Sequence, residues 1–316
     1  MNDVSFSELL SQYATYKYLR PKTIETYMGV VRVFRHYVGP DTLPSMITVD
    51  VVVNWRSRII RSKSNPKGIA ESSWNNYARH MKALFKFGIE YNLIAVENNP
   101  FDKVSVRQPK KPKKSLRPDQ IMYAREVLSL ARTYEAKFQE RSKLYPSWFW
   151  QAVMETFYYT GIRLNQLLHI TAGDINLKKK SFRASAEGSK TNAETTLPIP
   201  DELFPYLQKL LVAAHNSGFK REDQLFNVNR FSSRHHRIGM DTYQVERFFQ
   251  ALSGLTGSRI SPHRFRHYLG TTLMSSPSRN IHLTQQILNH TDLRSTMEYV
   301  HPDLEEMRKA LNQRVG

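Results

Sequence analysis

Apolar residues recur every three or four positions through the first hundred residues of the chain, which is the spacing of one face of an α-helix. One such stripe follows Pro21, a residue that favours the first turn of a helix, and three others flank it. We therefore expect residues 1–107 to form a helical domain with its aromatic side chains in the core. The four stripes are Phe6, Leu9, Leu10 and Tyr13; Ile24, Tyr27, Val31, Phe34 and Val38; Val51, Val52, Trp55 and Ile59; and Trp74, Tyr77, Met81, Leu84, Phe85 and Ile89.

The second half of the chain has a mixed pattern. Residues 181–185 form a short β segment, a turn follows at 187–191, and residues 195–199 show β-branched alternation, which together predict a β-hairpin. Helical spacing surrounds this hairpin. The predicted fold class is therefore mainly α, with a small antiparallel β-sheet in a C-terminal domain of residues 119–316. The expected helices of this domain are 118–130, 147–159, 201–214, 241–255, 262–274, 283–288 and 294–300.

The segment between the two halves, residues 108–118 (QPKKPKKSLRP), contains three prolines and four lysines. Prolines oppose regular structure and the lysines repel one another, so we expect an exposed, extended linker. A linker surrounded by solvent and a linker lying along phosphate groups both fit this composition. The second interpretation makes Lys110, Lys111, Lys113 and Lys114 candidates for binding a polyanion.

Composition adds a partner class to this picture. The chain has 46 lysines and arginines against 28 aspartates and glutamates, a net charge of +18 that favours nucleic acid as the partner. No apolar stretch approaches the roughly 20 residues of a membrane span, so we expect no membrane partner. The polar faces of the N-terminal helices offer further basic candidates for contacts with phosphates, namely Arg56, Arg58, Lys82 and Lys86.

The chain contains no cysteine. Disulfide scaffolds, thiolate zinc sites, iron–sulfur clusters and cysteine nucleophiles are thereby excluded, and a reducing compartment fits. The first ten residues are polar and acidic, unlike a signal peptide, so we expect a cytoplasmic protein.

Four groups of polar residues have no evident role in packing a hydrophobic core, so we consider them candidates for the chemistry of a site. Arg163 lies in TGIRLNQ (160–166), where a glycine turn meets a helix start and favours anion binding. Lys190 lies at the tip of the predicted hairpin. HRFRH (263–267) places His263 and Arg266 on one helical face. The fourth group is LNH, residues 288–290, with Tyr299 nine residues after His290.

The two histidines of HRFRH have a spacing that zinc sites use. The motif lacks the glutamate of metalloproteases and the chain offers no obvious third ligand, so we expect no metal.

In this order, the four groups resemble the motifs of the tyrosine recombinase (phage integrase) family, which includes the Cre and Xer recombinases. The resemblance spans nearly the whole chain and implies a helical, SAM-like N-terminal domain that binds the core DNA site, a linker and a catalytic domain. It implies six catalytic residues: Arg163, Lys190, His263, Arg266, His290 and the nucleophile Tyr299. Gln166 stands where the family usually has an acidic residue and keeps a supporting role, and Asn289 replaces the usual glycine.

The chemistry follows from these residue types. A tyrosine oxygen can attack a phosphodiester, and the covalent protein–phosphate intermediate keeps the energy of the broken DNA bond. His263 is the candidate to take the phenol proton, and Lys190 to protonate the leaving 5′-oxygen. Arg163 and Arg266, with His290, can hold the non-bridging oxygens. We therefore expect site-specific DNA recombination without a cofactor or a metal.

Residues 303–314 continue beyond Tyr299 with Leu304, Met307 and Leu311 on one helical face. This segment either packs on its own domain or, as the resemblance implies, docks on a neighbouring protomer and builds a homo-tetramer on two double-stranded DNA sites. Accessory or directionality proteins and a nucleoid-associated location are compatible with this interpretation. Two alternatives stay open: a DNA-binding or architectural protein without catalysis, and a type IB topoisomerase.

Overall fold

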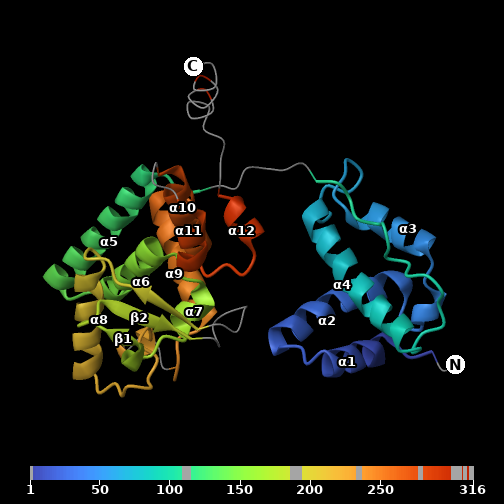
Figure 1. Cartoon of the computed structure of the whole chain (residues 1–316), viewed down its shortest axis with the longest axis horizontal. Helices are drawn as coiled ribbons and strands as arrows, with labels where there is room; N and C mark the ends of the chain where they lie inside the picture. The colour runs from blue at the N-terminus through green and yellow to red at the C-terminus, as the bar shows by residue number, and fades with distance from the viewer. Residues whose placement is uncertain are drawn as a thin grey trace. The chain divides into compact units, whose positions relative to one another are not determined.

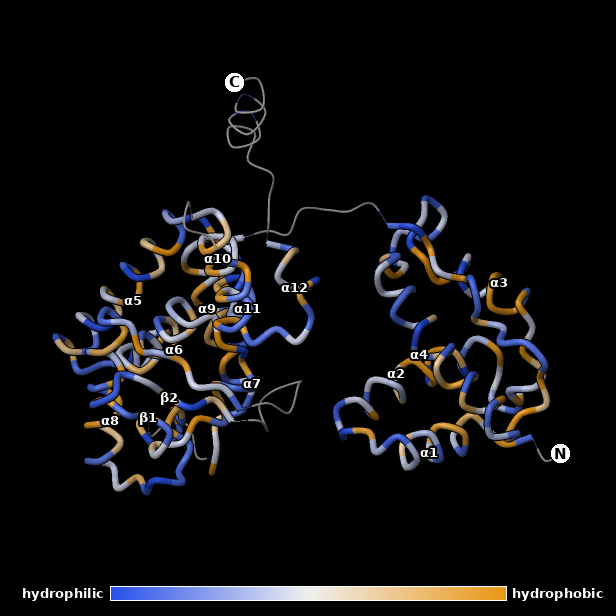
Figure 2. The backbone as a smooth tube through the Cα atoms, viewed as in Figure 1, coloured by the Kyte–Doolittle hydropathy of each residue, from blue (hydrophilic) through white to orange (hydrophobic). Residues whose placement is uncertain are grey.

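The computed structural model describes residues 3–108, 115–185, 194–232, 237–276 and 280–299, together with Arg308 and Asn312. The chain divides into two compact units, Met1–Pro112 and Lys113–Gly316 (Figure 1). Figure 2 shows apolar and polar residues alternating along the helices of both units, as amphipathic helices require. Within the described part of the chain, every helix is too short or too polar to cross a lipid bilayer.

The N-terminal unit is helical, as the four apolar stripes predict. Ser5 and Glu8 form a reciprocal capping box at the start of the first helix. Trp55 and Trp74 meet edge to face at the centre of the core, with ring centroids 5.1 Å apart. The helices of this unit are α1 (Phe6–Tyr16), α2 (Pro21–Val38), η1 (Pro44–Met46, 3₁₀), α3 (Val49–Ile59) and α4 (Glu71–Glu90).

The C-terminal unit is built around one central helix, α6, which is buried along most of its length and packs against α5, α8 and α10 (Figure 1). The predicted fold class, mainly α with a small antiparallel sheet, is confirmed. Its helices are α5 (Pro118–Phe138), α6 (Ser147–Thr160), α7 (Leu164–Leu168), η2 (Ala172–Asp174, 3₁₀), α8 (Phe204–Asn216), η3 (Val228–Arg230, 3₁₀), α9 (Thr242–Thr256), α10 (Pro262–Ser275), α11 (Ile281–Ile287) and α12 (Leu293–Met297).

The sheet has three antiparallel strands in the order β1 (Ile175–Asn176), β2 (Ser181–Ala184) and β3 (Thr195–Pro198). Phe182 pairs with Leu197, and both side chains are buried. Arg183 points to the other face and bridges the buried Asp174 and Glu194 at the base of the hairpin. Lys190 and the rest of the hairpin turn lie outside the described residues.

Two helix ends differ from the pattern-based prediction in ways that bear on the site. α5 continues to Phe138, eight residues past the predicted end at 130, and stops where Gln139 takes a left-handed conformation with φ +54°. The helix α12 ends at Met297 instead of 300, so Tyr299 lies in the turn that follows it.

Candidate active site

The junction between α6 and α7 places the first arginine. Gly161 ends α6 with a left-handed φ of +58°, and a side chain there would begin 2.9 Å from Leu269 of α10. The left-handed turn is therefore the reason for a glycine here, and its missing side chain also leaves room for Leu269. The next helix begins at Leu164, which makes Arg163 its N-cap residue.

Arg163 is fixed by two contacts and keeps one donor unused. Its Nη2 donates to the carbonyl of Asn289 at 3.0 Å, and its backbone N–H donates to Oε1 of the buried Gln166 at 3.3 Å. Among the described residues, the buried Nη1 has no hydrogen-bond acceptor. Burial lowers the pKa of Arg163, and the proximity of Tyr299 opposes that change. A buried donor without an acceptor favours the arrival of an anion.

Arg266 lies on α10 and is 6% exposed. It donates to the Gly161 carbonyl at 2.8 Å and to the Leu288 carbonyl. The pKa of Arg266 is lowered to about 10, mainly by burial and also by the charge of Arg163, while the interaction with Tyr299 opposes both effects. Within the described part of the chain, neither arginine pairs with a carboxylate. The two desolvated guanidiniums therefore form an anion site.

Tyr299 is 4% exposed and packed between two histidines. The ring of His290 lies parallel to it with centroids 5.9 Å apart, and the ring of His267 meets it at 5.0 Å and 62°. Gly270, one turn before the end of α10, makes room for the phenol: a side chain there would begin 2.9 Å from the Tyr299 ring. The phenol is held by rings on two sides and by Arg266.

The LNH motif orients His290. Asn289 takes the left-handed conformation, with φ +47°, as a residue in the place of glycine must. Nδ1 of His290 lies 2.9 Å from Oγ1 of Thr296, which is fully buried at the start of the segment leading to Tyr299. This contact sets the ring plane of His290.

His263 is exposed at the start of α10, one helical turn before His267. The two rings are 4.6 Å apart at 88°, so His267 contacts both His263 and Tyr299. Sequence reasoning treated His267 only as a possible metal ligand and missed it as part of this site. The sequence feature that could have indicated this role is the position of His267, four residues after His263 and next to Arg266. Among the described residues, no three His, Asp or Glu side chains gather as a metal site.

The structure thus brings together four of the predicted catalytic residues: Arg163, Arg266, His290 and Tyr299. Gln166 holds the backbone of Arg163. His263 contacts His267, which in turn contacts Tyr299. Lys190 lies outside the described residues, so its place relative to this group is not described.

The basic residues of the N-terminal unit that we expect to contact phosphates differ in how far their side chains are already engaged. Arg56 is half-buried and donates to the Val104 carbonyl at 3.3 Å, and Lys82 pairs with Asp102 at 2.7 Å. The guanidinium of Arg58 lies 5.7 Å from the ring centre of Tyr37, and Lys86 is exposed. Lys110, Lys111, Lys113 and Lys114 of the linker lie outside the described residues.

Comparison with known proteins places this site in a family. The model of the phage integrase family matches residues 120–306. A putative tyrosine recombinase XerC of Pseudomonas syringae is 37% identical over 314 residues, which cover 99% of this chain and 65% of that protein. A putative tyrosine recombinase XerC of Pseudomonas aeruginosa is 36% identical over 308 residues, covering 97% and 71%. The chain thus spans about two thirds of the length of these relatives.

Solved structures share the fold at low sequence identity. The Tn1549 transposon integrase in complex with transposon right end DNA has a TM-score of 0.74 at 17% identity, covering 99% of this chain and 100% of that one. A lambda integrase dimer bound to a COC′ core site has a TM-score of 0.63 at 17% identity, covering 95% and 78%. With the family match over most of the C-terminal unit and the relatives over nearly the whole chain, the protein belongs to the phage integrase family, and the resemblance carried by its motifs is confirmed.

Proposed function

We propose that this protein is a site-specific DNA recombinase that cuts and rejoins strands through a covalent 3′-phosphotyrosyl intermediate on Tyr299. One observation carries the proposal. The buried Tyr299 lies close enough to Arg266 and Arg163 to interact with both charges, and Nη1 of Arg163 is buried without an acceptor among the described residues. A phosphodiester supplies the anion that this arrangement favours.

The two arginines act on the non-bridging oxygens of the attacked phosphate. Their guanidiniums are already desolvated and held by backbone carbonyls, so little reorganisation is needed as charge develops on those oxygens. His290, oriented by Thr296, adds a third donor. Gln166 keeps a supporting role because it holds the backbone of Arg163.

The covalent step exchanges one phosphate ester for another. The Tyr299 oxygen forms a bond to phosphorus while the bond from phosphorus to the 5′-oxygen breaks, and the 3′-phosphate stays on the protein. His263 accepts the phenol proton and Lys190 protonates the leaving 5′-oxygen. Attack by a 5′-hydroxyl from the partner strand reverses these steps and rejoins DNA without a cofactor or a metal ion.

The rest of the chain is proposed to hold and pair the DNA. Residues 1–107 bind the core site, residues 108–118 link this domain to the catalytic domain at 119–316, and the basic side chains of both parts contact the backbone. Residues 303–314 pack on a neighbouring protomer and build a homo-tetramer on two double-stranded sites, with accessory proteins compatible. A cytoplasmic, nucleoid-associated location follows from this substrate. The relatives named as recombinases and the DNA-bound neighbours support these proposals.

The test is capture of the intermediate. A nicked suicide duplex carrying the native site, identified from DNA flanking the gene, is expected to give a denaturation-resistant adduct that Tyr299→Phe abolishes. Absence of an adduct on a bound site would overturn the proposal and favour an architectural protein. Exchange between paired sites then separates a recombinase from a topoisomerase. Lys190→Ala is expected to cleave slowly and to recover on a substrate with a better 5′ leaving group; without recovery, Lys190 is not the acid.

A further inference from the structure

The turn at Leu288 and Asn289 offers one backbone carbonyl to each arginine of the site. Nη2 of Arg266 donates to the Leu288 carbonyl, and Nη2 of Arg163 donates to the Asn289 carbonyl at 3.0 Å. The backbone N–H of Asn289 donates to the carbonyl of Gln286, in α11, at 3.0 Å. The backbone of Asn289 is thereby fixed beside a guanidinium of the anion site.

The side chain of Asn289 has no comparable role in holding the fold. Its amide nitrogen, Nδ2, is buried and has no hydrogen-bond acceptor among the described residues. A buried N–H without an acceptor destabilises a protein, because it gives up its hydrogen bonds to water and gains none in return. The stability of the unit therefore does not explain this amide.

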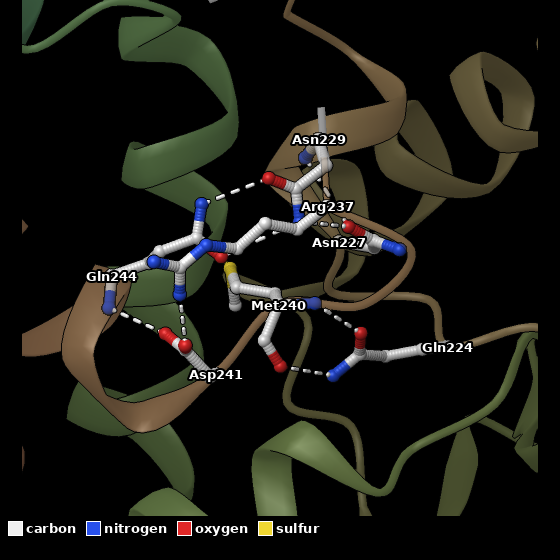
Figure 3. Close-up of polar contacts among 7 residues, drawn as sticks. All are labelled: Gln224, Asn227, Asn229, Arg237, Met240, Asp241 and Gln244. Carbon is white, nitrogen blue, oxygen red and sulfur yellow. Dashed lines mark hydrogen bonds and ion pairs between the residues drawn. The ribbon is translucent and has the colours of Figure 1, made fainter. Parts of the chain in front are cut away.

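Other side-chain amides inside the same unit are paired. Figure 3 shows four of them near the start of α9, and all four donate hydrogen bonds of 2.7–3.3 Å: Gln224, Asn227, Asn229 and Gln244. Asn229 and Gln244 each donate to the side-chain oxygen of the other. An amide that serves the fold is thus satisfied within it, and the amide of Asn289 is not.

Arg163 has the same feature at the same place. Within the described ranges, just two buried side-chain nitrogens lack a hydrogen-bond partner, namely Nη1 of Arg163 and Nδ2 of Asn289. These two residues are bonded to each other through the Asn289 carbonyl. Because the asparagine side chain is short, Nδ2 stays close to that carbonyl. The site therefore holds two buried, unpaired donors on neighbouring residues.

A neutral donor suits the surroundings of this second nitrogen. The guanidiniums of Arg163 and Arg266 are already desolvated here, and each lowers the stability of a further cation by charge repulsion. An amide N–H adds a hydrogen bond to an anionic oxygen without adding charge.

We propose that Asn289 is a further catalytic residue for strand cleavage, with Nδ2 donating to a non-bridging oxygen of the attacked phosphate beside Nη1 of Arg163. This proposal rests on the recombinase function, which supplies the phosphate. The backbone of Asn289 has a φ of +47°, which asparagine tolerates and glycine adopts freely. Asparagine thus permits the turn and adds a donor that glycine lacks.

Asn289→Gly removes the amide and keeps the turn accessible. Single-turnover cleavage of the suicide duplex at saturating protein is expected to fall about tenfold or more, because one donor to the developing charge is lost. The urea midpoint of the C-terminal unit should be unchanged or raised, since an unpaired buried donor is removed. Native cleavage by this variant would overturn the proposal. Slower cleavage with a lowered midpoint would also overturn it and assign the amide to the fold.

Asn92→Gly is the matched control. Asn92 is exposed after α4 and also has a left-handed backbone, with φ +54°. The same replacement at this position should leave cleavage at the native rate, and an equal loss in both variants would reveal a backbone effect and overturn the proposal. Asn289→Asp keeps the side-chain shape but replaces the donor by a negative oxygen that repels the phosphate. It should cleave more slowly than Asn289→Gly, and faster cleavage would contradict the contact.

A methylphosphonate at the cleavage position identifies the contacted oxygen, because a methyl group replaces one non-bridging oxygen in each diastereomer. The difference in rate between the native protein and Asn289→Gly should disappear on one diastereomer and persist on the other. An equal difference on both would overturn the contact and leave the recombinase function intact. Absence of an adduct between the native protein and the unmodified duplex would instead overturn the function.

Discussion

The imidazole of His267 packs on the ring of Tyr299, with centroids 5.0 Å apart and planes at 62°. Its other neighbour is His263, whose ring lies 4.6 Å away. His267 is 4% exposed and packs directly against the phenol ring of Tyr299. Its ring also contacts His263, the proposed proton acceptor. In this arrangement His267 is a positioning residue for the attack of Tyr299.

Removal of His267 is expected to slow strand cleavage without weakening DNA binding. His267→Ala and His267→Phe should each lower the single-turnover cleavage rate about tenfold or more, since a ring alone cannot connect His263 to the phenol. His267→Gln should recover part of the rate, because its amide restores a polar group at this position. Native rates in His267→Phe would reduce the role of His267 to packing.

A substitution of Gly270 is expected to lower adduct formation without lowering the stability of the fold. Gly270→Ala adds a methyl group 2.9 Å from the Tyr299 ring and so displaces the nucleophile, while alanine favours the helical conformation of α10 by about 1 kcal/mol over glycine. We expect adduct formation to fall at least tenfold with the urea midpoint unchanged or raised. The matched control is Gly254→Ala on α9, where nothing lies within 4 Å. It should raise stability and leave cleavage at the native rate; a similar loss in both variants would contradict this explanation.

Thr296 is expected to act through His290. Thr296→Val keeps the shape of the fully buried side chain but removes the oxygen 2.9 Å from Nδ1 of His290, so the imidazole loses its orientation. Cleavage should fall about tenfold in Thr296→Val and stay close to native in Thr296→Ser, measured on the suicide duplex at saturating protein. Equal activity of the two variants would show that His290 is oriented by other contacts.

The motifs of the site could be read from the sequence because each is a short local pattern: the glycine turn before Arg163, the histidine–arginine spacing on α10, and LNH before Tyr299. The helices were predicted by periodicity, since burial of one face is a local signal. The contact of Gly270 with Tyr299 and the packing of His267 bring together residues about thirty positions apart, and no spacing rule connects them. The two-residue strand β1 was missed for a related reason, because it exists only by pairing with β2.

The ion pair between α5 and α6 is expected to stabilise the C-terminal unit. Arg125 donates to both carboxylate oxygens of Glu155, at 2.7 and 2.6 Å, and its guanidinium lies 4.4 Å from the ring centre of Tyr158. Arg125→Met leaves the fully buried carboxylate without its partner, at a cost of about 3 kcal/mol in the free energy of unfolding. Arg125→Met/Glu155→Met should recover most of the stability; a double variant as unstable as Arg125→Met would contradict this.

Arg266 makes the stability of the protein depend on pH in the alkaline range. Its pKa is about 10 in the folded protein, well below the ordinary value of an arginine, so between these two values the unfolded chain binds the proton more strongly. The free energy of unfolding therefore rises with pH in that window, and below about pH 10 the cost of the buried charge is present in full. Relative to Arg266→Met, the native protein should gain about 1 kcal/mol between pH 8 and pH 11 in urea unfolding of the C-terminal unit. Because the other titrating groups are common to both proteins, parallel curves would show that the guanidinium is not desolvated as the structure describes.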